Sequence, residues 1–154
     1  METKETRVWK KVFESDLPYV ADELRSLIDT PAMVIIDGTL GAGKTTFIKE
    51  FVKYGGGEAT CSPSYSILSE TPTVLHADLY RIKSSEEIIH LELSLYLEDK
   101  EYFMVEWGKD QFSSLYRELP DDYSTYLLEI SINESGKLNT AESRNFVLQS
   151  ISEE

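Results

Sequence analysis

A glycine-rich segment at residues 38–45 has the residue types and spacing needed to hold a phosphate group. It reads Gly38-Thr39-Leu40-Gly41-Ala42-Gly43-Lys44-Thr45 and matches the pattern G-x-x-x-x-G-K-[S/T] at every fixed position. Glycines let the backbone approach an anion closely and adopt positive φ angles. The backbone amides then converge on the anion, and the N-terminus of a following helix adds its dipole. The segment therefore predicts a phosphate-binding loop.

Two side chains at the end of this loop predict nucleotide and metal binding. Lys44 is expected to reach the β- and γ-phosphates, and the Thr45 hydroxyl to ligate Mg²⁺. A continuous apolar run at 32–37 precedes the loop and an amphipathic helical pattern follows it, which is the setting that such a loop requires. The other positions expected to bind the nucleotide are Leu40, Gly41, Ala42, Gly43 and Thr46.

A magnesium site also needs a carboxylate, and two acidic residues end apolar runs. Glu106 follows the run 102–105 and is the better candidate; Asp78 follows the run 74–77. Either could hold the metal, directly or through water, or orient an attacking water. The alternative for each is a structural role, as a helix cap or as the partner of a basic side chain.

Other aromatic and imidazole side chains give weaker signals. Trp107 could stack near the nucleotide, and a buried aromatic at a strand end is the alternative. His76 and His90 have no companions at metal-ligand spacing, so we expect them in the core or on the surface. The single cysteine, Cys61, excludes an internal disulfide and suits a reducing compartment.

Length and charge narrow the possible functions. The 154 residues fit one domain spanning 1–154, and no apolar run approaches the ~20 residues that cross a membrane. With no signal-peptide pattern either, we expect a cytoplasmic protein. Acidic residues outnumber basic ones 28 to 15, for a net charge of −13, which argues against unaided nucleic-acid binding. A basic protein partner or simple solubility would each explain the charge.

The elements that must position these residues alternate between strand and helix. Helical patterns begin at Ser15 or Asp16, after the glycine-rich loop, and at Ser84 or Ser85, where 88–97 supplies the apolar face. Strands are expected at 7–13, 32–37, 65–68, 73–78 and 102–106, with a final hairpin of 125–133 and 144–151. This order predicts a three-layer α/β/α P-loop NTPase fold with a mixed, mostly parallel sheet and a C-terminal β-hairpin. Ligands then bind beyond the carboxyl ends of the strands.

Three classes of phosphate-loop protein compete. A GTPase should carry N-K-x-D and D-x-x-G motifs, and the chain has neither. A small-molecule kinase usually needs an arginine-bearing lid, whereas the five arginines here are scattered: Arg7, Arg25, Arg81, Arg117 and Arg144. An ATPase that acts on a partner remains the preferred interpretation. The kinase and a scaffold without turnover are the alternatives.

Four motifs in order give the chain a family resemblance. They are G-x-L-G-A-G-K-T-T ending at Thr46, S-P-S-Y ending at Tyr65, H-A-D-L-Y-R ending at Arg81, and V-E-W ending at Trp107. The set resembles the TsaE family, bacterial ATPases of tRNA threonylcarbamoyladenosine synthesis. The resemblance implies ATP and Mg²⁺ as ligands, slow hydrolysis by the chain alone, and the TsaB–TsaD pair as partners. Those partners would hold the tRNA and transfer the threonylcarbamoyl group, and the ATPase would permit repeated turnover.

The resemblance also implies roles for individual residues. Lys44 would contact phosphate, Thr45 and Glu106 would hold the metal, and Asp78 would lie at the same site as a metal or water contact. Trp107 would lie near the nucleotide, and residues 62–64 would form a switch-like loop. The chain departs from the usual family pattern at Thr39, Ser64 and Gly108, where relatives usually carry an acid, a threonine and a proline. The departures at Thr39 and Gly108 bear on the loop shape and on the hydrolysis rate.

Overall fold

The computed structural model describes residues 1–54, 67–134 and 142–153. Its seven-stranded mixed sheet has the order β1-β7-β6-β2-β5-β4-β3. The central strands β6, β2, β5 and β4 are parallel neighbours, and the three outer pairings are antiparallel. The strands are β1 (Glu2–Val12), β2 (Ala32–Asp37), β3 (Leu68–Glu70), β4 (Val74–Asp78), β5 (Tyr102–Glu106), β6 (Ser124–Asn133) and β7 (Ser143–Ser152). The carboxyl ends of the four parallel strands therefore meet at one edge.

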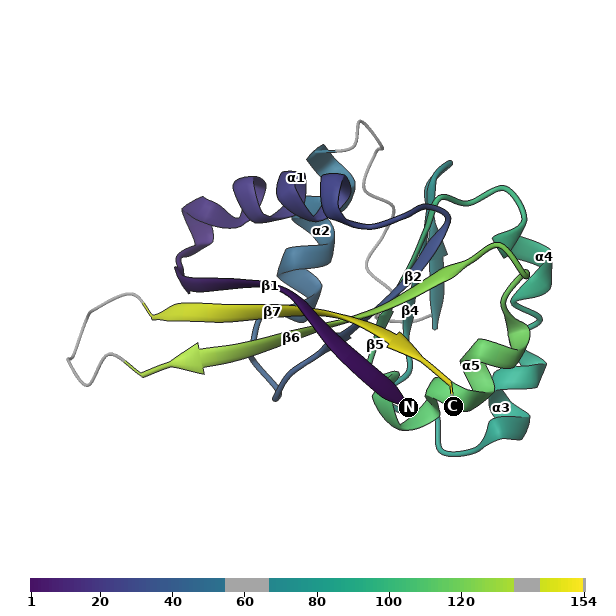
Figure 1. Cartoon of the computed structure of the whole chain (residues 1–154). Coiled ribbons are helices and arrows are strands. Elements are labelled where there is room, and N and C mark those ends of the chain that lie inside the picture. The colour runs from purple at the N-terminus through teal and green to yellow at the C-terminus, as the bar shows by residue number, and fades with distance from the viewer. Residues whose placement is uncertain (55–66, 135–141, 154) are drawn as a thin grey trace.

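Helices cover both faces of this sheet, as the three-layer prediction requires (Figure 1). Helices α1 (Leu17–Leu27) and α2 (Lys44–Tyr54) pack on one face; α3 (Ser85–His90), α4 (Ser94–Leu97) and α5 (Phe112–Glu118) pack on the other. Strand β2 supplies both cores by alternation, with Val34 and Ile36 facing α1 and α2, and Met33 and Ile35 facing the opposite side. The continuous apolar run at 32–37 thus reflects burial on both faces.

Helix α3 has the predicted side-chain cap, whereas Asp16 at the start of α1 makes no capping hydrogen bond through its side chain. The Ser84 hydroxyl accepts a hydrogen bond from the Glu87 amide at 3.3 Å, so α3 begins at Ser85. The predicted helical face 88–97 is divided, because Glu92 has a φ of +53° between α3 and α4. A left-handed residue cannot continue a right-handed helix, and the apolar side chains are buried from two short helices.

The strand predictions hold with shifted bounds. β1 begins at Glu2, five residues before the predicted strand, and the C-terminal segment forms the predicted hairpin of β6 and β7. The strand predicted at 65–68 is found at Leu68–Glu70; residues 65 and 66 lie outside the described part of the chain, as do Cys61 and the 62–64 segment. In the described part, no helix has the length and apolar character needed to span a membrane.

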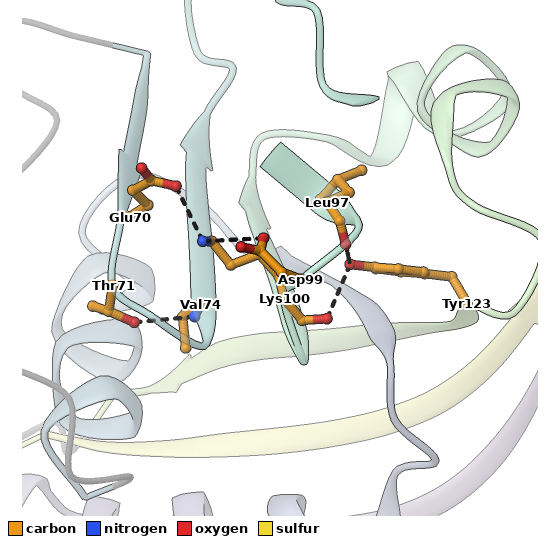
Figure 2. A network of polar contacts seen from close by, with 7 residues as sticks. All are labelled: Glu70, Thr71, Val74, Leu97, Asp99, Lys100 and Tyr123. Carbon is orange, nitrogen blue, oxygen red and sulfur yellow. Dashed lines mark hydrogen bonds and ion pairs between the residues drawn. The ribbon is translucent and has the colours of Figure 1, made fainter. Parts of the chain in front are cut away.

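A polar network connects the loops at the amino ends of the central strands (Figure 2). The Lys100 ammonium lies 3.1 Å from a Glu70 carboxylate oxygen and 3.6 Å from one of Asp99. The Tyr123 hydroxyl donates to the Leu97 carbonyl at 2.6 Å and lies 3.3 Å from that of Lys100. Burial, with Asp122 and Asp99 nearby, raises the pKa of Tyr123 to about 12, so the hydroxyl stays protonated as a donor.

Candidate functional site

The glycine-rich segment leaves β2 and enters α2 with a backbone that glycine permits. Gly41 and Gly43 have φ angles of +82° and +101°, a region that side-chain-bearing residues rarely adopt. Gly38 is required for a different reason, because a Cβ there would lie 2.6 Å from the Ile130 carbonyl oxygen on β6. Helix α2 begins at Lys44, so its first amides lie at the carboxyl edge of the sheet. This arrangement suits an anion.

Lys44 is buried beside this loop without an acidic partner. Its ammonium donates to the carbonyl oxygens of Gly38 at 2.6 Å and Thr39 at 3.0 Å, and lies 3.9 Å from the centroid of the Trp107 ring. Among the described residues, no carboxylate oxygen lies within 4 Å of it. Burial lowers the pKa of Lys44, against the attraction of nearby acids such as Glu106. Its partners are groups that a phosphate can replace.

Glu106 ends β5 and is 2% exposed, with both carboxylate oxygens engaged. Oε1 accepts a hydrogen bond from the Thr45 hydroxyl at 2.7 Å, and Oε2 lies 2.6 Å from His76 Nε2. An ionised carboxylate only accepts, so the histidine nitrogen is the donor. Burial alone would raise the pKa of Glu106, but the hydrogen bonds from His76 and Thr45 hold it below its usual value. The group is therefore an anion at neutral pH.

The Thr45 and Glu106 pair fits a magnesium ion. Hard oxygen donors are the ligands that this ion prefers, and it commonly takes one or two of them from the protein with water and substrate phosphates completing the shell. In the described segments, no group of three or more His, Cys, Asp and Glu side chains is placed to hold a metal. Thr45 and Glu106 would thus supply the protein's share, with Asp78 near.

Asp78 reaches the same edge as Glu106 but is engaged differently. The two residues are register partners on the parallel strands β4 and β5. Asp78 is half-buried, and its Oδ1 accepts a hydrogen bond from the Tyr80 amide at 3.1 Å, which fixes the turn after β4. Asp78 therefore lies at the same sheet edge as Glu106, and its carboxylate stabilises a turn, neither capping a helix nor, in the described part of the chain, pairing with a basic side chain.

Trp107 follows Glu106 with a φ of +60°, unusual for a residue with a side chain. Its ring meets the Lys44 ammonium and packs edge-on against Tyr80, with centroids 5.0 Å apart. The next residue, Gly108, has a φ of −101°, outside the range that a proline ring allows, and a Cβ there would lie 2.6 Å from Val105 Cγ1. The local backbone is thus suited to the glycine by which this chain departs from its relatives.

A cavity of about 810 Å³ opens beside the first half of the loop. Trp107 and Thr39 line it together with the end of β6, from Glu129 to Ile132, and acidic side chains at its rim, Asp37, Glu134 and Glu142. Residues of β6 line the cavity on one side of β2, and Trp107, which follows β5, lines it on the other.

The predicted site residues gather at this edge, with two additions that the sequence did not indicate. Thr45 contacts Glu106, and Lys44 contacts Trp107. Leu40, in contrast, is 76% exposed at the loop tip, and Thr46 is exposed on the first turn of α2. His76 is in the core as expected, and it also contacts Glu106. Arg144, on β7, bonds to loop carbonyls. Neither contact joins residues close in sequence.

Comparisons with known proteins agree with this geometry. A family model described as "Threonylcarbamoyl adenosine biosynthesis protein TsaE" matches residues 13–143. Among the similar curated proteins is the "tRNA threonylcarbamoyladenosine biosynthesis protein TsaE" of Rickettsia bellii, 42% identical over 83 residues, which are 50% of this chain and 57% of that one. The protein of the same name from Rickettsia typhi is 34% identical over 112 residues, 69% of each chain.

A solved structure extends the likeness to the whole fold. The crystal structure of YdiB from Bacillus subtilus superposes with a TM-score of 0.63 over 99% of this chain and 89% of that one, at 22% sequence identity. At that identity the likeness shows the fold alone. The chain spans less than three fifths of the length of the first two Rickettsia relatives, 57% and 58%.

Proposed function

The chain belongs to the TsaE family, and from that premise we propose that it is an ATPase that supports tRNA threonylcarbamoyladenosine synthesis. It would bind ATP with Mg²⁺ at the 38–45 loop and hydrolyse it to ADP and phosphate. The observation that carries this proposal is the 2.7 Å contact between the Thr45 hydroxyl and the buried Glu106 carboxylate, next to a lysine that forms no ion pair with any acid in the described part of the chain. A lysine, a hydroxyl and a carboxylate so placed are the parts that phosphoryl chemistry uses.

Binding follows from the groups along the loop. The loop amides and the start of α2 would hold the β-phosphate, and the Lys44 ammonium would exchange the Gly38 and Thr39 carbonyls for phosphate oxygens. The bonds of Lys44 to two uncharged carbonyls would be replaced by bonds in which the donor and the acceptor are both charged. The cavity between the loop, Trp107 and β6 would receive the nucleoside.

Hydrolysis requires a water oxygen to bond to the γ-phosphorus while the bond to the β–γ bridging oxygen breaks, giving ADP, inorganic phosphate and a proton. Bound Mg²⁺ would neutralise charge on the phosphate oxygens. Glu106 would hold the metal site, and Glu106 or Asp78 would orient the water. His76, bonded to Glu106 Oε2, would keep the carboxylate turned toward Thr45.

The proposed partners are TsaB and TsaD. The family resemblance suggests them, and the net charge of −13 supports a role in which they, not this chain, hold the tRNA. A surface sensitive to the γ-phosphate would dock on the partners with ATP bound, and hydrolysis would release it, because losing the γ-phosphate removes contacts from nearby loops.

The test is threonylcarbamoylation of tRNA by TsaB and TsaD of the same organism, with and without this chain. The proposal expects product to pass one per partner complex only when the chain and hydrolysable ATP are both present. If the amount of product is unchanged while free phosphate is still released, the proposed role in tRNA modification is contradicted and the proposed ATPase activity still stands. Phosphate transferred to a metabolite, with none released, would instead identify a small-molecule kinase.

A further inference from the structure

Arg144 connects the C-terminal hairpin to the phosphate loop. It lies near the start of β7, 102 residues after its main partner in the chain. Its Nε donates to the Ala42 carbonyl at 2.9 Å, and its Nη2 lies 3.4 Å from the Gly41 carbonyl. The Arg144 guanidinium also contacts Glu142, whose backbone carbonyl oxygen lies 3.3 Å and whose carboxylate oxygen lies 3.8 Å from Nη1. The side chain is 24% exposed.

The loop backbone needs such a restraint. Ala42 is 1% exposed and packs in the hydrophobic core. A Cβ placed at Gly41 or Gly43 would meet no described atom within 4 Å, so the two flanking residues hold their positive-φ conformations without side-chain contacts. Glycine is also the residue with the most backbone freedom to lose. In a planar trans peptide the C=O and N–H point in opposite directions. Fixing the Ala42 oxygen on Arg144 therefore turns the Gly43 amide hydrogen to the opposite side.

We propose that Arg144 is a positioning residue that holds the phosphate loop in its anion-binding conformation by fixing the Ala42–Gly43 peptide. The role rests on the proposed function, since it concerns nucleotide binding at this loop. Arg144 donates to the Ala42 oxygen, on the side of this peptide opposite to the Gly43 amide hydrogen, so an anion bound at that hydrogen would leave the Arg144 bond in place. The family model matches residues 13–143 and ends one residue before Arg144, so that match assigns it no role.

The test compares Arg144→Met with Arg117→Met, an exposed arginine on α5 whose Nη2 is 3.5 Å from Ser114 Oγ. Calorimetric titration with ADP and with ATP is combined with amide hydrogen exchange of the nucleotide-free protein. Arg144→Met is expected to weaken both nucleotides equally, about tenfold, and to speed exchange at Gly43 and Lys44. Arg117→Met should leave both measurements at the wild-type value.

A second variant separates charge from geometry. Arg144→Lys keeps the positive charge but loses the planar fork, so its affinities should lie closer to those of Arg144→Met than to wild type. Arg144→Lys also provides the test of the proposal if Arg144→Met does not fold. Wild-type affinity in the folded Arg144 variants would overturn the inference, as would weakening of ATP alone, which would indicate direct γ-phosphate contact. A wild-type chain that binds neither nucleotide would overturn the proposed function itself.

Discussion

Two buried lysines lie at opposite ends of the same sheet and are held in opposite ways. Lys44, 5% exposed at the carboxyl edge, bonds to two neutral carbonyls and a tryptophan face. Lys100, 8% exposed at the amino edge, pairs with the carboxylates of Glu70 and Asp99. The two lysines are similarly buried, but Lys100 contacts carboxylates directly, whereas no carboxylate oxygen among the described residues lies within 4 Å of the Lys44 ammonium.

The difference indicates which polar network is a site. At the amino edge, Lys100 and the Tyr123 hydroxyl connect the loops before β5 and β6 to the ends of β3 and α4, and these contacts are complete without a ligand (Figure 2). At the carboxyl edge, Thr45 and Glu106 bond to each other at the place where each could bond to a metal. A buried cation that no carboxylate contacts directly carries an electrostatic cost that an anionic ligand in contact with it reduces. The comparison predicts that variants at the carboxyl edge change nucleotide binding or hydrolysis, and that variants at the amino edge change the stability of the fold.

The largest expected effect is on hydrolysis. Glu106→Gln should lower the ATP hydrolysis rate by about a hundredfold or more, because the carboxylate at the metal and water is lost, while ATP affinity changes only a few-fold. The matched variant at the other edge, Glu70→Gln, should hydrolyse ATP at the wild-type rate. Phosphate-release kinetics measure both. A wild-type rate for Glu106→Gln would transfer the role to Asp78, which Asp78→Asn would then test.

The next largest effect is expected when each of the two buried lysines is replaced. Lys44→Met should weaken ADP and ATP binding by roughly 30- to 100-fold, since charge-assisted hydrogen bonds to phosphate are lost, with an unchanged or raised Tm. Lys100→Met should bind nucleotide normally and lose about 1 kcal/mol of stability, because its carboxylate partners are half-exposed or more and can be hydrated. Calorimetry and urea unfolding distinguish them. Equal nucleotide affinities in the two variants would contradict the comparison.

A smaller effect is expected at His76. His76→Ala should lower Mg²⁺-dependent hydrolysis by about tenfold, because Glu106 Oε2 loses its donor and the carboxylate can turn. His76→Gln, whose amide nitrogen can donate at the same place, should recover most of the rate. The Mg²⁺ concentration for half-maximal rate is measured for each variant, with the exposed His90→Ala as control. Equal loss in the alanine and glutamine variants would indicate a packing role only.

The smallest effect concerns Tyr123 and pH. Its folded pKa of about 12 lies above the ordinary value of 10, so its contribution to stability is present below pH 10 and is lost as pH rises toward 12. Tyr123→Phe should cost about 1 kcal/mol at pH 8 and less at pH 11, with no change in nucleotide affinity. Urea unfolding at both pH values measures this, with the exposed Tyr116→Phe as control. A pH-independent difference would contradict the assignment.

The contiguous parts of the site could be predicted from sequence, and the long-range parts could not. The loop, Lys44 and Thr45 form one short pattern, and Glu106 ends an apolar strand. The contact of His76 with Glu106 depends on the pairing of β4 with β5, and that of Arg144 with Ala42 spans 102 residues. Neither contact produces a local periodicity in the sequence from which it could be predicted. The break at Glu92 was also hidden, because two short helices and one long helix can bury the same apolar residues.

The central claim, that Lys44 with its carbonyl partners marks a nucleotide site, is tested most directly by a crystal structure with a non-hydrolysable ATP analogue and Mg²⁺. The prediction is that the Lys44 ammonium leaves the Gly38 and Thr39 carbonyls for phosphate oxygens, while Thr45 and Glu106 turn to the metal and Arg144 stays on Ala42. Lys100 should keep its carboxylate partners unchanged. An analogue bound elsewhere, with Lys44 still on the two carbonyls, would contradict the claim.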